Sequence, residues 1–549
     1  MSTPWRYLGA MRKLSRQYER LGHDGGLSRI RELKNALVDR PLYSDRSIFD
    51  RWFWATKLES AEISVRQFTQ DRYASVDFNR ALIGALGSAR SPVSVPLPAA
   101  LLDLLREHGL PVNRARSLAH WYWLALLRFG QGVILVVSML GNGLTGRGKT
   151  DRTANDAAHL LMLTSANLPP PTAYERPYDI CSWYANWPGR RADIQRLFHN
   201  VSDSDPHQAN GMPVQYRSQP CDVAPNGIAL LKFAKWSICA CTVAGLGLVA
   251  GRWWYALLLA EAAKAKLVSL QGKDELAAEY LFPFSANTYR PLWTYAAAEK
   301  GSCISLYFYS TFEQIKLPHG YESQKFEWGA STWPRYIVWD EWQAAQLRRD
   351  LGSGIEIMVV GSIAFADSGQ DLPVAMSPRI AVFDVPPHRK LGHFGVSTLA
   401  DYRLLAPEVD QHFVSDIAEA LDGTGATMML KRKRDIGRRA SRSYSCLTDK
   451  LCRRQKLTMV GSAISAARLI AACDAAISIP FTSTALYARE LGIPTVYYDP
   501  SGVIDKNDRA AHQIIVLSGP AELHRWVAQM IEYWEQQVTN KSGLTKDHI

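Results

Sequence analysis

A hydroxyl-rich turn follows one of the apolar runs near the C-terminus of this sequence. The run 475–479 is typical of a buried strand, and a helix is predicted to continue through Glu490. The turn between them consists of Pro480, Phe481, Thr482, Ser483 and Thr484. Hydroxyl groups and free backbone N–H groups at a helix N-terminus bind anions, so we predict that this turn holds a phosphate or diphosphate. The alternative is that Thr482 or Ser483 only caps the helix.

A run of cations follows another predicted strand, 427–430. The run consists of Lys431, Arg432, Lys433 and Arg434. So many positive charges at one strand end repel one another unless an anion binds there, and guanidinium groups match the geometry of phosphate. We therefore predict that this run contacts the same phosphate. The alternatives are a solvated basic loop and a nucleic-acid patch, and the lack of interleaved aromatic residues disfavours the latter.

A third strand end carries a carboxylate and an imidazole. Asp384 and His388 follow the predicted strand 379–383, and the prolines between them stiffen the turn. Either group can take a proton from a substrate in this position, so both are predicted catalytic residues. The alternative is a crossover loop without a chemical role.

Polar residues also surround a possible strand in the middle of the chain. Glu279 is a predicted catalytic base, and Asn287 and Arg290 are predicted to bind an acceptor substrate. These roles require that two α/β domains oppose each other across a cleft. The alternative for each of the three residues is a purely structural role.

Short apolar runs alternate with helical stretches in the second half of the chain, as is typical of parallel βαβ units in a doubly wound sheet. The predicted strands are Tyr336–Trp339, Glu356–Val360, Arg379–Phe383, Thr427–Leu430, Ala475–Ile479 and Thr495–Tyr498. The clearest predicted helices are Val409–Leu421 and Ile464–Ala472. Ligands of such sheets bind beyond the carboxyl ends of the strands, so we expect the predicted site residues to gather at that edge.

These patterns divide the chain into four parts. Residues 1–150 form a helical region, 151–330 a first Rossmann-like domain, 331–520 a second Rossmann-like domain, and 521–549 a C-terminal helix and tail. The first domain contains an apolar insert at about 226–270. Its predicted elements are strands at Leu160–Leu163, Tyr178–Tyr184, Met212–Tyr216 and Cys303–Tyr309, and a helix at Trp293–Lys300. The expected fold class is therefore α/β, with two Rossmann-like domains that face each other and a helical, partly apolar N-terminal region.

Two stretches of the chain, 129–146 and 236–251, contain no charged residue. A membrane span needs about 20 apolar residues, so we expect helices that are buried or that dip into a membrane rather than cross it. The sequence does not choose between the first two. Residues Trp5–Leu21 predict an amphipathic helix with a basic face, which either packs on a neighbour or lies on an acidic membrane surface.

The composition is that of a folded protein. The chain has 549 residues, of which 47% are hydrophobic and 21% charged, which excludes a disordered, collagen-like or coiled-coil chain. Its formal net charge of +11 indicates a surface that attracts anions. The eight cysteines include no Cys-x-x-Cys pair, so we predict neither a disulfide framework nor structural zinc, and we expect the protein in the reducing cytoplasm.

The hydroxyl-rich turn and its surroundings resemble the bacterial polysaccharide-biosynthesis proteins named for a Pro-Phe-Thr-Ser (PFTS) motif. The segments that carry the resemblance are Ile479–Ala485, Ala488–Pro500, Arg290–Trp293, Tyr307–Ser310, Val338–Asp340, Phe383–Pro386 and Lys431–Arg434. They lie within about residues 280–515, roughly half of the chain.

This resemblance implies the GT-B glycosyltransferase fold, in which the C-terminal Rossmann domain takes a nucleotide-sugar and the N-terminal domain takes the acceptor. Many retaining enzymes of that fold carry a glutamate five residues before a Gly-x-Pro turn, where this sequence has Tyr487. This departure argues against that group. Neither the residues nor the resemblance requires a metal or another cofactor.

We therefore expect a glycosyltransferase of bacterial surface polysaccharide of the O-antigen or capsule type. It would move a sugar from a nucleotide-sugar to a glycan or lipid-linked acceptor, with peripheral contact at the cytoplasmic face of the inner membrane. The hydroxyls and cations would hold the donor, and Glu279, Asp384 or His388 would act as the base. The alternative is a non-catalytic scaffold of a membrane polysaccharide assembly complex, and a nucleic-acid-binding protein is a weaker third possibility.

Overall fold

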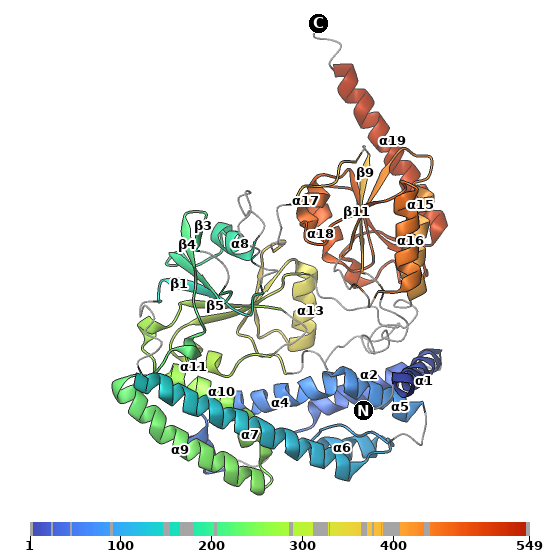
Figure 1. The fold of residues 1–549 in the computed structure, drawn as a ribbon. Helices are drawn as coiled ribbons and strands as arrows, with labels where there is room; N and C mark the ends of the chain where they lie inside the picture. The colour runs from blue at the N-terminus through green and yellow to red at the C-terminus, as the bar shows by residue number, and fades with distance from the viewer. Residues whose placement is uncertain are drawn as a thin grey trace.

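The computed structural model contains two α/β units and a layer of helices beneath the first of them (Figure 1). It describes residues 4–23, 26–43, 47–87, 92–145, 154–164, 168, 179–202, 206–284, 289–310, 328, 330–363, 370–375, 378–385, 387, 407–432, 437 and 440–544. The predicted α/β class, with two Rossmann-like sheets and a helical N-terminal region, is confirmed.

The first sheet is almost entirely parallel. Its strands are β1 (Ala157–Leu160), β2 (Arg196–His199), β3 (His207–Ala209), β4 (Met212–Tyr216), β5 (Glu279–Pro283), β6 (Cys303–Tyr307), β7 (Arg335–Val338) and β8 (Glu356–Val359). They follow the order β3-β4-β2-β1-β5-β6-β7-β8, and only β3 runs antiparallel to its neighbour. Its helices are α8 (Ile180–Asn186), α11 (Trp293–Glu299) and α13 (Glu341–Leu351).

Two sequence predictions for this unit are wrong. The predicted domain boundary at residue 331 comes too early, because β7 pairs with β6 and β8 pairs with β7, which extends the first sheet to residue 359. The predicted strand Tyr178–Tyr184 overlaps α8, because the Asp179 side chain accepts a hydrogen bond of 2.7 Å from the Ser182 N–H and so starts a helix. The predicted strand at Met212–Tyr216 and the helix at 293–300 are confirmed.

The helical layer packs beneath the first sheet. It comprises α1 (Pro4–His23), α2 (Gly26–Asp39), α3 (Asp50–Phe53), α4 (Leu58–Ala74), α5 (Val76–Leu86), α6 (Ala99–Glu107), α7 (Arg114–Thr145), α9 (Gly227–Val249) and α10 (Trp253–Leu270). Its buried residues share one core with the sheet. The C-terminal half of α1 contributes Tyr18 and Leu21 to that core, so this half packs on its neighbours. The uncharged stretches fall in α7 and α9, which both pack on α10.

The second sheet is fully parallel. Its strands are β9 (Arg379–Asp384), β10 (Thr427–Arg432), β11 (Thr458–Val460), β12 (Ala475–Ser478), β13 (Thr495–Asp499) and β14 (Val516–Ser518). Their order, β11-β10-β9-β12-β13-β14, is the 3-2-1-4-5-6 order of a Rossmann fold. The order reverses between β9 and β12, where ligands of such sheets bind.

Helices cover both faces of the second sheet, as its apolar strands require. One face is covered by α15 (Pro407–Ala420), α16 (Arg442–Arg453) and α19 (Pro520–Leu544), and the other by α17 (Ala466–Ala471) and α18 (Ser483–Glu490). Figure 1 shows α17 and α18 on the side turned toward the first unit, while α19 extends away from it.

Candidate active site

Three neighbouring strands of the second sheet end together at the point where the strand order reverses. In register, Arg432 of β10 lies opposite Asp384 of β9, and Ser478 of β12 lies opposite Phe383. The predicted phosphate and acid–base residues of this unit therefore share one edge. It is the edge formed by the carboxyl ends of the strands, where the sequence pattern predicts these residues to gather.

The hydroxyl-rich turn at 480–484, which we call the PFTS turn, is held by a chain of hydrogen-bonded hydroxyl groups. The Oγ1 atom of Thr484 lies 3.0 Å from Ser478 Oγ and 3.1 Å from Thr482 Oγ1. Thr482 in turn donates to the carbonyl of Ile479 at 3.0 Å, and the Tyr497 hydroxyl donates to the Thr482 carbonyl at 3.0 Å. Hydroxyl groups of the turn itself, of β12 and of β13 therefore fix its shape.

The geometry of the turn leaves the first N–H groups of α18 open. Thr482 is the N-cap residue, but its side chain accepts no capping hydrogen bond; its hydroxyl is turned to the Ile479 carbonyl, to which it donates. Phe481 has a φ of 65°, a conformation that non-glycine residues rarely adopt and that clusters at functional sites. The alternative that Thr482 caps α18 through its side chain is therefore wrong. The turn presents N–H groups and hydroxyls together.

The basic run divides between the two faces of the sheet. Strand β10 continues through Arg432, so Lys431 and Arg432 point to opposite faces. Lys431 is 8% exposed and donates to the Ser462 carbonyl at 3.1 Å. Arg432 donates to Thr448 Oγ1 at 2.9 Å and lies over the Tyr444 ring. The expectation that the whole run forms one cluster is therefore wrong for its first two members.

Lys431 lies on the same face as the PFTS turn. It pairs with Phe383, which pairs with Ser478, so these three side chains form one row across β10, β9 and β12. Two strand spacings separate Lys431 from Ser478, about 10 Å between their backbones. The Lys431 ammonium group contacts Ser462, which follows β11 on the side of β10 away from β12, so it has to leave that carbonyl to reach an anion bound at the turn.

Asp384 lies at the end of β9 on the other face of the sheet. Its side chain is 2% exposed, and Oδ2 accepts a hydrogen bond from the Tyr444 hydroxyl. The other oxygen, Oδ1, has no hydrogen-bond partner among the described residues. Burial raises the pKa of Asp384 to about 6, although the Tyr444 hydroxyl and the charge of Arg432 favour the carboxylate. A buried carboxylate with one oxygen that lacks a hydrogen-bond partner, and with this pKa, can accept a proton near neutral pH.

Four other predicted site residues lie outside the described residues: His388, Asn287, Lys433 and Arg434. Their roles stay predictions. In the part of the chain that the structure describes, no three metal-ligating side chains lie close enough to hold a metal ion.

Glu279 lies at the amino end of β5, the edge opposite to the one where the site was predicted. Its carboxylate accepts hydrogen bonds from Tyr184 at 2.6 Å and Ser305 at 3.3 Å, and Arg335 lies 3.6 Å away. Burial raises its pKa. The structure does not bring Glu279 together with Asp384, and its contacts join strands to a helix within the first unit.

Arg290 lies after the carboxyl end of β5, but its guanidinium group is used within the fold. It is 5% exposed, donates to Thr294 Oγ1 at 3.0 Å and to the Thr332 carbonyl at 2.7 Å, and lies 3.6 Å from the centre of the Tyr295 ring. This side chain holds the start of α11 in place beside the predicted acceptor region.

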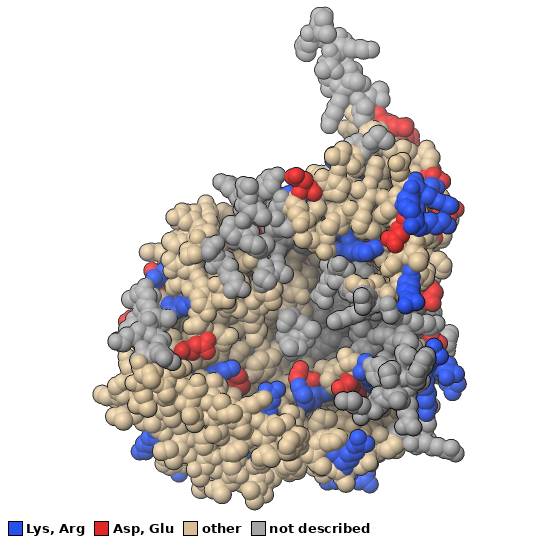
Figure 2. Space-filling view, in the orientation of Figure 1, with Lys and Arg blue, Asp and Glu red and all other residues tan. Residues whose placement is uncertain are grey.

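The two α/β units meet at the carboxyl end of β7. Oδ2 of Asp340 lies 2.5 Å from Nδ1 of His512 and 3.8 Å from Arg489, both in the second unit. The Ser362 N–H after β8 donates to Glu490 at the end of α18 at 3.3 Å. Figure 2 shows the surface hollowed between the two units. Helix α18 therefore begins at the PFTS turn and ends at the junction.

Replacing Asp340 by alanine is expected to weaken this junction. The carboxylate also caps α13 by accepting from the Gln343 N–H at 2.9 Å, so the variant loses a cap and a charged hydrogen bond, about 2 kcal/mol together. Although burial opposes it, the contact with His512 lowers the pKa of Asp340, so its stabilisation is present at neutral pH and is lost as the pH falls through that lowered pKa. Thermal unfolding at neutral pH measures the loss. Glu341→Ala, which removes a neighbouring acid that is 73% exposed, is the control and should change little.

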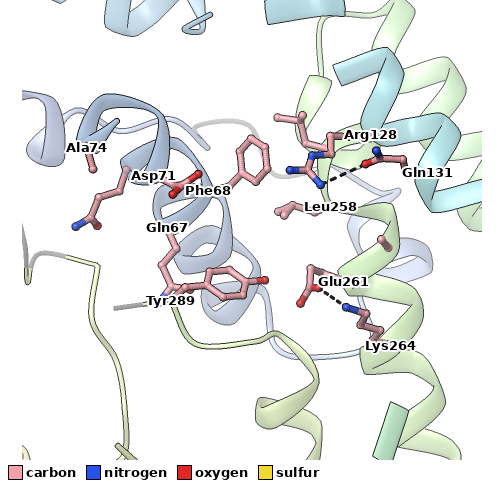
Figure 3. Close-up of a pocket in the computed structure, with 13 residues that line it drawn as sticks. Gln67, Phe68, Asp71, Ala74, Arg128, Gln131, Leu258, Glu261, Lys264 and Tyr289 are labelled. Atoms are coloured by element: carbon pink, nitrogen blue, oxygen red, sulfur yellow. Dashed lines mark hydrogen bonds and ion pairs between the residues drawn. The ribbon is translucent and has the colours of Figure 1, made fainter. Parts of the chain in front are cut away.

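A pocket of about 390 Å³, lined by both polar and apolar residues, lies among α4, α7 and α10, beside the carboxyl end of β5 (Figure 3). Figure 3 shows Arg128 beside Gln131, at 3.2 Å, and Lys264 paired with Glu261 at 3.1 Å. Tyr289 reaches in from the first sheet, and burial together with a hydrogen bond to Glu261 raises its pKa well above its ordinary value. No pattern in the sequence predicts this pocket; the predicted site residues closest to Tyr289 in the chain are Asn287 and Arg290, both expected to bind the acceptor.

Comparison with known proteins identifies a family. The family model described as "Polysaccharide biosynthesis PFTS motif protein" matches residues 236–527, more than half of the chain. This match confirms the resemblance predicted from the sequence. No curated protein matches.

Solved structures resemble the chain only distantly. The crystal structure of Anabaena Alr3699/HepE in complex with UDP and glucose has 11% identity and a TM-score of 0.36, over 68% of this chain and 89% of that one. The pneumococcal O-GlcNAc transferase GtfA in complex with UDP and GlcNAc has 12% identity and a TM-score of 0.26, over 51% and 60%. These similarities are too low to transfer a ligand or an activity.

Proposed function

This chain belongs to the polysaccharide biosynthesis PFTS motif family, and we propose that it acts there as a glycosyltransferase. It transfers a sugar from a nucleotide-sugar to a glycan or lipid-linked acceptor of a bacterial surface polysaccharide. One observation carries the proposal: the PFTS turn and Asp384 flank the point where the strand order of a Rossmann sheet reverses. Sheets of this order bind nucleotides at that point.

The donor phosphates bind at the PFTS turn. The N–H groups at the start of α18 and the hydroxyls of Thr482 and Ser483 face the phosphate, and Lys431, on the same face of the sheet, reaches it by turning its ammonium group away from the Ser462 carbonyl. Helix N-termini and cations stabilise negative charge, and this charge grows on the phosphate as its bond to the sugar breaks. The turn therefore stabilises the leaving group.

Asp384 is the base that this proposal favours among the three predicted ones. Its free oxygen takes the proton from the acceptor hydroxyl as that oxygen attacks the anomeric carbon of the sugar. The bond from the sugar to the phosphate breaks, and the nucleotide leaves with the electron pair. A carboxylate with a pKa of about 6 is mostly ionised at neutral pH and still basic enough for this step.

The acceptor binds in the pocket of Figure 3. Carboxylate, guanidinium and amide groups of the exposed residues Asp71, Arg128 and Gln131 offer acceptors and donors for sugar hydroxyls, and the Phe68 ring offers an apolar surface. Tyr289 places the pocket beside the carboxyl end of β5. Parallel strands share that edge, so it is also the edge from which Asp340 of β7 contacts the second unit.

The proposal predicts that one nucleotide-sugar stabilises the protein. A ligand at 100 times its Kd adds about 2.7 kcal/mol to the free energy of unfolding. Thermal unfolding against CMP-, UDP-, GDP- and dTDP-sugars and their free nucleotides measures this gain. A selective rise with one base supports a transferase and identifies the donor class. A flat panel with a well-folded sample contradicts it and favours the non-catalytic scaffold.

A further inference from the structure

We propose that the outer face of the α7 and α9 pair binds an anionic lipid bilayer and inserts one side of each helix into it. This outer face consists of Ile134, Val137 and Leu144 of α7 and Ile238, Leu246 and Val249 of α9, whose exposed fractions are 61–90%. Figure 2 shows a broad surface without charged side chains over the two helices. Soluble proteins rarely leave a contiguous apolar patch of this kind in water.

The exposed residues repeat at helical spacing along α7. Trp123, Leu127, Ile134, Val137 and Leu144 are separated by multiples of one turn and form a single stripe. The helix has 32 residues and is about 48 Å long. Trp123 lies at one end of the stripe, and tryptophan side chains favour the boundary between lipid and water. The exposed apolar residues of α7 therefore form one stripe along the helix, which makes the helix amphipathic, and are not scattered singly over its surface.

The inner sides of both helices are packed on the protein. By length and composition alone α7 and α9 could each cross a membrane, and only 22% and 28% of their apolar windows are buried. Glycines let both helices pack closely on α10: a Cβ atom at Gly132 would lie 2.8 Å from Leu259, and one at Gly247 would lie 2.8 Å from Tyr255. Because α10 covers the inner sides, lipid can contact only the outer face. The pair lies in the membrane surface and does not span the bilayer.

The charges on the two helices favour an anionic bilayer over a second copy of the chain. Neither α7 nor α9 contains Asp or Glu. Lys232 and Lys235 are exposed within about a turn of Leu231 and Ile238, so they lie beside the outer face. A symmetric dimer through this face would bring the lysines of two chains together. Anionic headgroups pair with them instead, while long lysine stems allow the apolar side chains to insert.

The bilayer would lie next to the proposed acceptor pocket. Arg128 and Gln131 of α7 line the pocket, and they stand in the chain between Leu127 and Ile134 of the stripe. An acceptor with a lipid anchor could therefore keep its chain in the bilayer while its sugar enters the pocket. This step rests on the proposed function, whereas the bilayer contact itself does not.

Vesicle flotation of the full chain tests the contact. The protein is mixed with phosphatidylcholine vesicles or with phosphatidylcholine–phosphatidylglycerol vesicles, without any sugar substrate. We expect it to float with the anionic vesicles and less with the neutral ones. Ile134→Asp with Ile238→Asp should lower the bound fraction about tenfold or more, since aspartate is costly to insert. The matched control, Val374→Asp with Ile515→Asp, changes two exposed apolar residues elsewhere and should bind as the wild type does.

Three outcomes would overturn the proposal. The first is no binding of the wild type to anionic vesicles, and the second is an equal loss in both double variants. The third is a concentration-dependent dimer, seen by sedimentation, that the Ile134→Asp/Ile238→Asp variant dissociates while vesicle binding is absent. Circular dichroism and thermal unfolding establish that each variant is folded. Because flotation uses no nucleotide-sugar, its result is independent of the test of the proposed function.

Discussion

Asparagine in place of Asp384 is expected to slow sugar transfer by about 10²- to 10⁴-fold, the usual contribution of a general base, with donor affinity nearly unchanged. The substitution keeps the size of the side chain and the oxygen that accepts from Tyr444. The wild-type rate should rise with pH through about 6 and level off above it, because the pKa of Asp384 is about 6. Single-turnover kinetics across this pH range measures both effects. A variant that retains most of its transfer rate would exclude Asp384 as the base.

The same substitution is expected to stabilise the fold. The pKa of Asp384 is raised from 3.8 to about 6 by burial, so the folded state favours the protonated carboxyl. Below about pH 4 the group is protonated in both states and has no effect. Between about pH 4 and pH 6 the unfolded state ionises while the folded state keeps the proton, so the folded state is progressively destabilised, by about 3 kcal/mol at most above pH 6. Asp384→Asn should therefore raise the melting temperature at pH 8 and not at pH 4.

Asp499, at the end of β13 in the same sheet, is the control for the stability effect. It is 1% exposed, and its carboxylate accepts hydrogen bonds from the Ser501 N–H, the Ser501 hydroxyl and the Ile504 N–H. Asparagine there removes a fully bonded carboxylate and should lower the melting temperature at pH 8. If both variants change stability in the same direction, the raised pKa of Asp384 does not cause the gain.

The position of the site could be predicted from the sequence, because it depends only on the order of elements. Buried strands followed by polar residues place those residues at the carboxyl edge, whatever the register. Asp384, Lys431 and the PFTS turn all lie there. The division of the basic run could not be predicted, because the four consecutive charged residues indicate a strand that ends at Leu430. Strand β10 continues to Arg432, and its alternation sends the two cations to opposite faces.

Features that depend on contacts between distant segments were also missed. The boundary between the sheets carries no signal in the sequence, because β7 is a short apolar run of the same buried type as the strands of the second sheet. The pocket of Figure 3 joins residues of α4, α7 and α10 with Tyr289. In the sequence those residues are only polar positions on separate helices. The contact of Asp340 with His512 likewise joins residues whose separation in the chain carries no signal.

Replacing Lys431 by methionine together with Ser483 by alanine is expected to weaken donor binding by about 100-fold or more. Hydrogen bonds to a charged phosphate contribute about 1.5–3 kcal/mol each, and every 1.4 kcal/mol is a factor of ten in Kd. Methionine keeps most of the volume of the largely buried Lys431 and removes its charge. Isothermal titration with the nucleotide-sugar selected by the thermal panel measures the change.

The matched control for this pair is Lys456→Met with Ser415→Ala. Both residues belong to the second unit, and Lys456 pairs with Asp422 on the surface. This control should bind the donor as the wild type does, because neither side chain lies at the strand ends of the site. Unchanged binding in the Lys431→Met/Ser483→Ala variant would place the phosphates elsewhere. Weak donor binding in the Lys431→Met/Ser483→Ala variant would assign stabilisation of the leaving group to the face of the sheet that carries Lys431. Normal donor binding with slow sugar transfer in Asp384→Asn would assign proton transfer to the opposite face.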